Sequence, residues 1–308
     1  MLPFKLIYSD AYFLPIGQHV FPAEKYRRIH DKLIESGVAD AADFLTPQPA
    51  SDQDILLVHK PQYVNKLKTG TLSAMEELQM EIPYSPELVN TFWLSAGGSS
   101  LAAMIHDVAV AIRRMQRDGN IRTAMTVDCD VHQGNGTAAI FAGMRTGSQV
   151  MSEPLPSSGP AVLGKKPLMR GAHAGDVFTI SLHQENNYPP HKPPSSIDVD
   201  LPDGTTDGDY LAWLDHALSS GLRQFTPDLI CYIAGADPYC EDQLGGLALT
   251  IEGLKKRDEL VFRVARAKGI PVMVTYAGGY AQRVEDTVTI HCNTVAAAAE
   301  VFASPPAT

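Results

Sequence analysis

Short apolar runs alternate with longer amphipathic segments in the second half of the chain, and this alternation limits the possible folds most. The runs are rich in β-branched residues and comprise Ile121–Cys129, Val177–His183, Asp228–Ala234 and Ile270–Tyr276. Nearly continuous apolar strands are typical of parallel sheets that are covered on both faces. Strands that alternate with helices therefore predict a parallel α/β sheet with right-handed crossovers.

Helical periodicity separates these strands. Leucines and valines at helical spacing predict amphipathic helices over Asp209–Phe225 and Thr250–Lys268, with Thr250 as a plausible N-cap. A further helix is expected over Asn293–Ala303, and His291 is expected to precede and cap it. The pattern predicts a chain that ends on a helix packed against the sheet.

Length and charge narrow the class of protein. The 308 residues suit one large α/β domain, and a net charge of -10 argues against a broad basic surface for nucleic acid. We expect no direct nucleic-acid binding and no membrane span, since no apolar run is long enough. The N-terminus lacks the features of a secretory signal, so a cytoplasmic location is expected. No two of the four cysteines have CxxC spacing.

One segment departs from the α/β pattern. Residues 143–174 are rich in Gly, Pro and Ser and have no apolar period. This composition predicts a long flexible insertion inside the single domain of residues 1–308.

Three polar clusters follow three of the expected strands. DCDVHQGNG follows the first strand, AGADPYCEDQ follows the third, and AGGY follows the fourth. In parallel α/β sheets the ligand crevice lies beyond the carboxyl ends of the strands. We therefore expect the clusters to meet at one edge of the sheet.

The first two clusters contain the residue types of a metal site. Alternate side chains at a strand end face the same way, so Asp128, Asp130 and His132 can line one wall. A catalytic zinc site needs three protein ligands and an open position, and Asp237 in the second cluster supplies a further carboxylate. The alternative is that these acidic residues cap the following helix or lie in an exposed loop. Two acids at neighbouring strand ends are electrostatically costly without a cation.

The third cluster contains Tyr280 after two glycines, which allow a ligand to approach the main chain closely. A phenol beside a metal can donate a hydrogen bond to an oxyanion that forms on an amide. The alternative is an ordinary core aromatic residue. His183 ends another strand, where a lone histidine is more often a structural group than a ligand.

These motifs together resemble the histone deacetylase family. DCDVHQGNG resembles the family's DxDxHxGxG segment, in the form found in the class IV branch and its bacterial relatives. The resemblance extends over most of the chain outside 143–174, through the segments YSDAYFLPIGQHVFPAEKY, LVHKPQYVNKLKTGTLS, IPYSPELV, SAGG, SLHQENNYPPHKPPSSIDVDLPDGTTDGDYL, AGADPYCEDQLGGLALTIEG, YAGGYA and HCNT. It implies a three-layer α/β/α fold of the arginase/deacetylase type with a mainly parallel central sheet.

The resemblance also implies roles for individual residues. Asp130, His132 and Asp237 match the zinc ligands, and Tyr280 matches the tyrosine that polarises the scissile carbonyl. Three further residues match supporting positions: Asp128 and Ser181 at a structural cation site that would hold K⁺, and Asn135 where many members have an Asp that orients a histidine. The implied reaction is zinc-dependent hydrolysis of an N-acyl-lysine amide or of an acylated polyamine.

The chain departs from the family pattern at one point. The family has a strand, two adjacent histidines that serve as general base and acid, and a channel loop after the SAGG helix. Here Ser95–Met104 runs directly into Ile105, and no His-His dipeptide occurs. The departure predicts a lost strand, which leaves a gap or an edge in the sheet. Since His106 precedes a helix on another segment, we do not expect it to replace the lost dyad.

Three functions are consistent with these features. The first is a zinc-dependent deacylase whose turnover is weak or absent, because general acid–base groups contribute roughly a hundred- to ten-thousand-fold. The second is a noncatalytic protein that binds metal or an acylated amine. The third is an arginase-like ureohydrolase, which needs more Asp and His ligands for two metals than the single set found here.

Overall fold

The computed structural model describes residues 1–14, 16, 20–80, 82–98, 106–142, 168–170 and 176–303. The chain divides into two compact units, residues 1–120 and residues 121–308. The expectation of one domain over residues 1–308 stays a prediction. None of the helices in the described ranges is long and apolar enough to cross a membrane.

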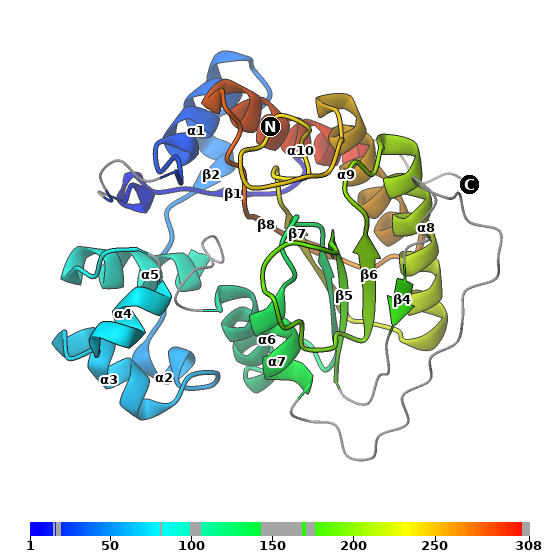
Figure 1. The fold of residues 1–308 in the computed structure, drawn as a ribbon. Coiled ribbons are helices and arrows are strands. Elements are labelled where there is room, and N and C mark those ends of the chain that lie inside the picture. The colour runs from blue at the N-terminus through cyan, green and yellow to red at the C-terminus, as the bar shows by residue number, and fades with distance from the viewer. Residues whose placement is uncertain are drawn as a thin grey trace. The chain divides into compact units, whose positions relative to one another are not determined.

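The second unit is built on a six-stranded sheet in the order β4-β6-β5-β3-β7-β8 (Figure 1). All neighbouring strands pair in parallel except β4, which is antiparallel to β6. Their bounds are β3 Ala124–Asp128, β4 Leu168–Arg170, β5 Val177–Gln184, β6 Ile197–Leu201, β7 Leu229–Ala234 and β8 Val272–Tyr276. The four predicted strands are β3, β5, β7 and β8, and the parallel sheet is confirmed.

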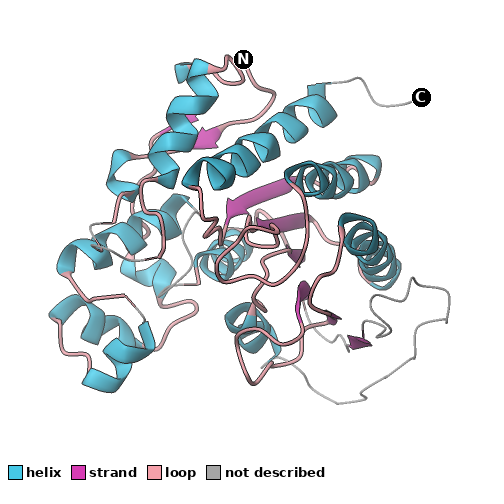
Figure 2. Cartoon of the chain, turned by 45° about the horizontal axis from the view of Figure 1, so that its top comes forward, coloured by secondary structure: helices cyan, strands magenta, loops and turns pink. Residues whose placement is uncertain are grey.

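Helices cover both faces of this sheet and complete the predicted three-layer α/β/α fold. They are α7 (Asn135–Ala142), α8 (Asp207–Gln224), α9 (Ile251–Ala267) and α10 (Val284–Ala303). Helix α7 lies on one face, and α8 and α9 lie on the other (Figures 1 and 2). The predicted N-cap is confirmed, since the side chain of Thr250 accepts a hydrogen bond of 2.9 Å from the N–H of Gly253.

The C-terminal helix is longer than predicted. It begins at Val284 rather than Asn293, so His291 lies inside α10 and the prediction that it caps the helix is wrong. Its ring is buried against Tyr276, with centroids 4.4 Å apart. The helix extends because residues 284–292 bury Val288 and Ile290, an apolar face that a short window at the chain end does not reveal.

The segment 143–174 differs partly from its prediction. Residues 168–170 form β4, whose backbone pairs with residues 198–200 of β6. The expectation of no regular structure is therefore wrong for these three residues. Residues 143–167 and 171–174 lie outside the described residues.

Strand β8 is the edge strand at one side of the described sheet. It pairs only with β7 among the described strands. Four of its five residues are only partly buried, whereas every residue of β3, β5 and β7 is buried. A partly buried edge strand with a pairing partner on one side only fits the expected loss of a strand.

The first unit is mainly helical. Its helices are α1 Lys25–Glu35, α2 Asp52–Ile55, α3 Pro61–Thr69, α4 Ala74–Met80, α5 Pro86–Gly98 and α6 Asp107–Arg117, with 3₁₀ turns η1 Asp10–Tyr12 and η2 Ala41–Asp43. Two short strands, β1 (Leu6–Ile7) and β2 (Phe44–Leu45), pair in parallel. A core that includes Ile55, Leu67 and Phe92 holds the helices together.

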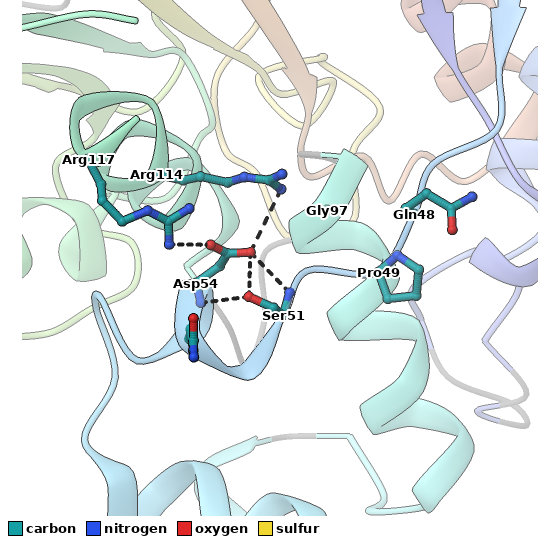
Figure 3. Close-up of a pocket in the computed structure, with 8 residues that line it drawn as sticks. Gln48, Pro49, Ser51, Asp54, Gly97, Arg114 and Arg117 are labelled. Carbon is teal, nitrogen blue, oxygen red and sulfur yellow. Dashed lines mark hydrogen bonds and ion pairs between the residues drawn. The ribbon is translucent and has the colours of Figure 1, made fainter. Parts of the chain in front are cut away.

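This unit contains an open polar pocket of about 540 Å³ (Figure 3). At one end Arg117 binds the buried carboxylate of Asp54 at 2.7 Å and the exposed Asp118 at 2.8 Å. Arg114 lies 3.8 Å from the same two carboxylates. The two positive charges of this pocket are therefore already offset by two negative ones.

Candidate metal centre

The carboxyl ends of three neighbouring parallel strands supply the candidate site. Asp130 and His132 follow β3, Asp237 follows β7, and Gly278 and Tyr280 follow β8. These strands end side by side in register, so the loops that leave them meet although they are far apart in the sequence. The predicted convergence of the three polar clusters is therefore found.

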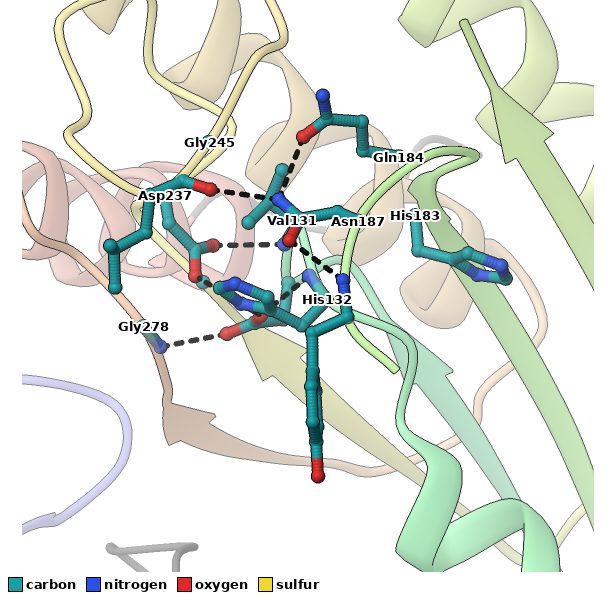
Figure 4. A network of polar contacts seen from close by, with 12 residues as sticks. Val131, His132, His183, Gln184, Asn187, Asp237, Gly245 and Gly278 are labelled. Carbon is teal, nitrogen blue, oxygen red and sulfur yellow. Dashed lines mark hydrogen bonds and ion pairs between the residues drawn. The ribbon is translucent and has the colours of Figure 1, made fainter. Parts of the chain in front are cut away.

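Asp130, His132 and Asp237 form a compact ligand set. Figure 4 labels His132 and Asp237, whose side chains point toward each other. One ligand atom from each residue lies within 4.8 Å of the other two. Nδ1 of His132 is 3.0 Å from Oδ1 of Asp130 and 3.3 Å from Oδ2 of Asp237. Asp237 is fully buried, and its Oδ2 has no hydrogen-bond partner among the described residues. Two carboxylates and one imidazole nitrogen thus converge on a single point.

The charges of this cluster are not balanced by the protein alone. Burial lowers the pKa of His132, but the close contacts with the carboxylates of Asp130 and Asp237 and their negative charges outweigh burial and raise the pKa to about 11. Burial and the charge of Asp130 raise the pKa of Asp237 to about 7. Without a cation the cluster therefore retains protons, and a divalent ion at its centre fits the residues because it would offset both carboxylates.

Main-chain donors orient the two carboxylates. The N–H of Val131 donates to Oδ1 of Asp237 at 2.9 Å, and the N–H of Gly278 donates to Oδ2 of Asp130 at 2.8 Å. A Cβ atom on Gly278 would lie 1.8 Å from Oδ2 of Asp237. Glycine is therefore required at this close approach, which explains the first part of the AGGY cluster.

Two tyrosines flank the imidazole of His132. The ring of Tyr280 lies edge-on, with its centroid 6.4 Å from that of the imidazole, and the ring of Tyr188 lies at 6.5 Å. The structure thus places Tyr280 beside the cluster, as expected. Sequence analysis did not identify Tyr188 as a site residue. Its side chain is 53% exposed in the structure. The only feature of the sequence that could have indicated Tyr188 is its place as an aromatic residue in a loop rich in Pro and Asn.

Asp128 and Ser181 lie opposite each other on β3 and β5. Asp128 is buried, and its Oδ1 accepts a hydrogen bond of 3.1 Å from the N–H of Asp130. The hydroxyl of Ser181 is 3.0 Å from Nδ1 of His183, whose Nε2 is 2.9 Å from Asp200. His183 is therefore a buried structural residue, as expected, in a chain of polar contacts that sequence reasoning did not find.

The sequence itself matches the histone deacetylase domain over residues 19–105 and 103–295. It is also 32% identical to an uncharacterised protein of Picosynechococcus, an alignment that covers 97% of this chain and 99% of that protein. The chain belongs to the histone deacetylase family. Two relatives are Histone deacetylase 2 of Arabidopsis thaliana and the histone deacetylase-like amidohydrolase of Pseudomonas aeruginosa. The Arabidopsis protein is 27% identical, in an alignment that covers 89% of this chain and 74% of that protein. The Pseudomonas protein is 24% identical, and the alignment covers 88% of this chain and 77% of that protein.

Solved structures share the histone deacetylase fold. A histone deacetylase homologue complexed with SAHA has a TM-score of 0.71 at 19% identity. The superposition covers 98% of this chain and 84% of the homologue's chain. The homologue from Aquifex aeolicus gives 0.70 at 19% identity with the same coverage. These similarities confirm the predicted fold class.

The two matched stretches of the histone deacetylase domain meet at residues 103–105. This is the point at which the family's His-His segment was expected and not found. The Picosynechococcus alignment spans 328 positions, so that relative has at least 20 residues within it that this 308-residue chain lacks. Both observations agree with a deletion in this chain.

Two residues that the sequence analysis discussed lie outside the ligand cluster: His106, which was not expected to act in the site, and Asn135, which was. His106 is the N-cap residue of α6, and its ring stacks on that of His59 at 6.0 Å in the first unit. Asn135 begins α7, and no hydrogen bond between its side chain and a histidine is found within the described residues. The role of Asn135 in orienting a histidine stays a prediction.

Proposed function

We propose that this chain is a zinc-binding amide hydrolase of the deacetylase type, with zinc held by Asp130, His132 and Asp237. The observation that carries the proposal is the buried Oδ2 of Asp237, which faces Nδ1 of His132 at 3.3 Å without a hydrogen-bond partner among the described residues. A zinc ion there would have three protein ligands and an open position, as catalytic zinc sites do.

The proposed substrates are N-acyl amines, either acylated lysine or an acylated polyamine. The family relatives named as deacetylases support this class, and so does the SAHA complex of a homologue. Tyr188 and Tyr280 would provide aromatic walls on two sides of His132, against which a methylene chain can pack.

The protein groups would divide the chemistry between them. Bound zinc would polarise the acyl carbonyl and lower the pKa of a water molecule. The hydroxyl of Tyr280 would donate a hydrogen bond to the oxyanion that develops on the carbonyl. The N–H groups of Val131 and Gly278 hold the ligand carboxylates in their orientation.

We also propose that Asp128 and Ser181 hold a monovalent cation such as K⁺. Burial and the neighbouring charge of Asp130 raise the pKa of Asp128 well above its usual value. A cation between Asp128 and the hydroxyl of Ser181 would stabilise the ionised carboxylate of Asp128, which burial and the charge of Asp130 disfavour. When the imidazole of His183 carries its proton on Nε2, it donates this proton to Asp200, and Nδ1 accepts a hydrogen bond from the hydroxyl of Ser181. The lone pairs of the Ser181 oxygen are then available to the cation.

Metal analysis of the purified chain tests the zinc site. We expect about one zinc per wild-type chain and almost none in Asp237→Ala, because three ligands define a single site. Asp203→Ala is the control, since Asp203 is an exposed acid near the same edge and lies outside the cluster. Equal zinc in wild type and Asp237→Ala would contradict the proposal.

A noncatalytic role is the second candidate function. The missing His-His dipeptide favours it, and within the described part of 121–303 the other histidines lie outside the ligand cluster. We expect SAHA to bind the zinc-loaded chain while hydrolysis of acetyl-lysine peptides stays very weak. Turnover on the order of ten per second, the usual level for enzymes, would show that the chain needs no His-His dyad.

A two-metal ureohydrolase is not supported. Among the residues that the structure describes, one group of three His, Cys, Asp or Glu side chains has ligand atoms within reach of a common ion. A second ion would need further acidic or histidine ligands beside this group.

A further inference from the structure

A fully buried arginine lies between the main-chain segments that lead to the ligands. Arg257 is on α9, and its side chain has no solvent exposure. Its Nη1 donates to two carbonyl oxygens, that of Cys129 at 3.3 Å and that of Gly235 at 2.6 Å. Cys129 directly precedes Asp130, and Gly235 lies two residues before Asp237. One nitrogen therefore joins the two segments that supply all three proposed zinc ligands.

These two carbonyls lie just beyond the ends of their strands. Strand β3 ends at Asp128 and β7 ends at Ala234, and the N–H of Cys129 still donates to the carbonyl oxygen of Ile233 at 3.0 Å. Among the described residues this is the last main-chain hydrogen bond between the two segments before the ligands. Buried carbonyl groups need a donor, and here both find the same guanidinium. The guanidinium thus continues the connection between β3 and β7 toward the ligands.

Asp258 holds the guanidinium in this position. Its Oδ1 accepts from Nε and Nη2 of Arg257 at 2.9 and 2.8 Å and from the hydroxyl of Tyr232 at 2.5 Å. Its Oδ2 accepts from the hydroxyl of Thr294 at 2.6 Å. The carboxylate is therefore fixed from β7 and from α10, and it leaves Nη1 of the arginine for the two carbonyls.

A buried ion pair is weak evidence for stability, because the cost of removing two charges from water is often as large as their attraction. What an apolar pair of similar size cannot supply is a donor for the carbonyls of Cys129 and Gly235. We propose that Arg257 is a positioning residue of the metal centre, which sets the spacing between the segment of Asp130 and His132 and the segment of Asp237. This inference rests on the proposed zinc site.

Zinc affinity of the full-length chain, measured by competition with a chromophoric chelator, tests this role. In Arg257→Lys a single ammonium cannot bridge both carbonyls and Asp258 together. The doubly neutral variant Arg257→Met/Asp258→Asn removes the charges but keeps an acceptor for Tyr232, so no unpaired charge is left buried. We expect the zinc Kd of both to rise about 10- to 100-fold, the usual effect of losing groups that orient ligands.

Thr294→Val is the matched control. It removes a hydrogen bond from the far oxygen of Asp258 and should lower the stability of the metal-free chain, while the zinc Kd changes less than about threefold. The visible absorption of the cobalt-substituted chain provides a second measurement, which should shift in the Arg257 variants and stay unchanged in Thr294→Val. A loss of stability alone would not move this spectrum.

The outcomes separate this inference from the proposed function. Arg257 variants that fold and bind zinc with wild-type affinity would overturn the positioning role and leave the zinc site intact. If neither Arg257 variant folds, the arginine is required for the fold itself and the positioning role is rejected. A wild-type chain whose zinc binding is unaffected by Asp237→Ala would overturn the zinc site, and the inference with it.

Discussion

The main-chain N–H of Gly278 donates a hydrogen bond of 2.8 Å to Oδ2 of Asp130, although 148 residues separate the two in the chain. The other oxygen of Asp130 faces Nδ1 of His132 at 3.0 Å. The loop after β8 thus orients a carboxylate that follows β3. This contact ties the third polar cluster to the first and makes the glycine part of the site.

Substitution of Gly278 should therefore damage metal binding more than stability. In Gly278→Ala the new Cβ would lie 1.8 Å from Oδ2 of Asp237, so the carboxylate must move. We expect zinc affinity to fall at least about 100-fold, beyond the effect of losing one orienting contact. Gly208→Ala on α8 is the control, since nothing lies within 4 Å of its Cβ. Equal zinc affinities in the two variants would refute this prediction.

Metal removal should change the stability of the wild type but not that of Asp237→Asn. At a zinc concentration one hundred times Kd, wild-type stability should rise by about 2.7 kcal/mol. With a chelator present, Asp237→Asn should be at least as stable as wild type, because it removes a buried carboxylate that the charge of Asp130 disfavours. Urea unfolding with and without zinc measures both effects, and similar stabilisation by zinc in both proteins would exclude Asp237 as a ligand.

Tyr280→Phe should separate catalysis from metal binding. The phenylalanine keeps the ring beside His132 but removes the proposed donor to the oxyanion, so residual kcat should fall about 100- to 1000-fold. Zinc content should not change. Tyr188→Phe, which alters the other tyrosine beside His132, should leave kcat unchanged. A kcat that falls equally in both variants would argue against a specific role for Tyr280.

The first unit should lose stability in mild acid. Burial and the charge of His106 lower the pKa of the half-buried His59 to about 4, below its ordinary value of 6.5. The folded state then binds this proton less readily than the unfolded state. The associated stability is fully present above pH 6.5 and is lost as the pH falls toward 4. After allowance for solvent screening, the loss should be about 1–2 kcal/mol.

Urea unfolding between pH 7 and pH 5 measures this loss, and His59→Gln is the comparison. Glutamine does not titrate and can still accept the hydrogen bond that the N–H of His106 gives to Nε2 of His59 at 3.3 Å. The stability of the variant should depend less steeply on pH than that of wild type. Parallel curves would show that His59 does not contribute.

Much of the candidate site could be predicted from the order of residues alone. The apolar runs identified four strands, and polar residues directly after them marked Asp130, His132 and Asp237. This worked because strand ends and the turns that follow are local features, and parallel strands bring their carboxyl ends to one edge. The same reasoning did not identify β6, because the buried acids Asp198 and Asp200 interrupt its apolar residues, and it did not identify β4, which has only three residues.

Other features depend on tertiary structure only. Arg257 reads as one charged residue on an amphipathic helix, yet it is buried because α9 places it beside two carbonyls at the strand ends. The contacts among Ser181, His183 and Asp200 likewise require β5 and β6 to be paired in one register. The sequence determined which residues can bind a metal, through their chemistry and their place after strands. Only the tertiary structure decided which buried groups orient the ligand residues, such as Arg257 and the N–H of Gly278, because burial and long-range pairing are properties of the packed chain.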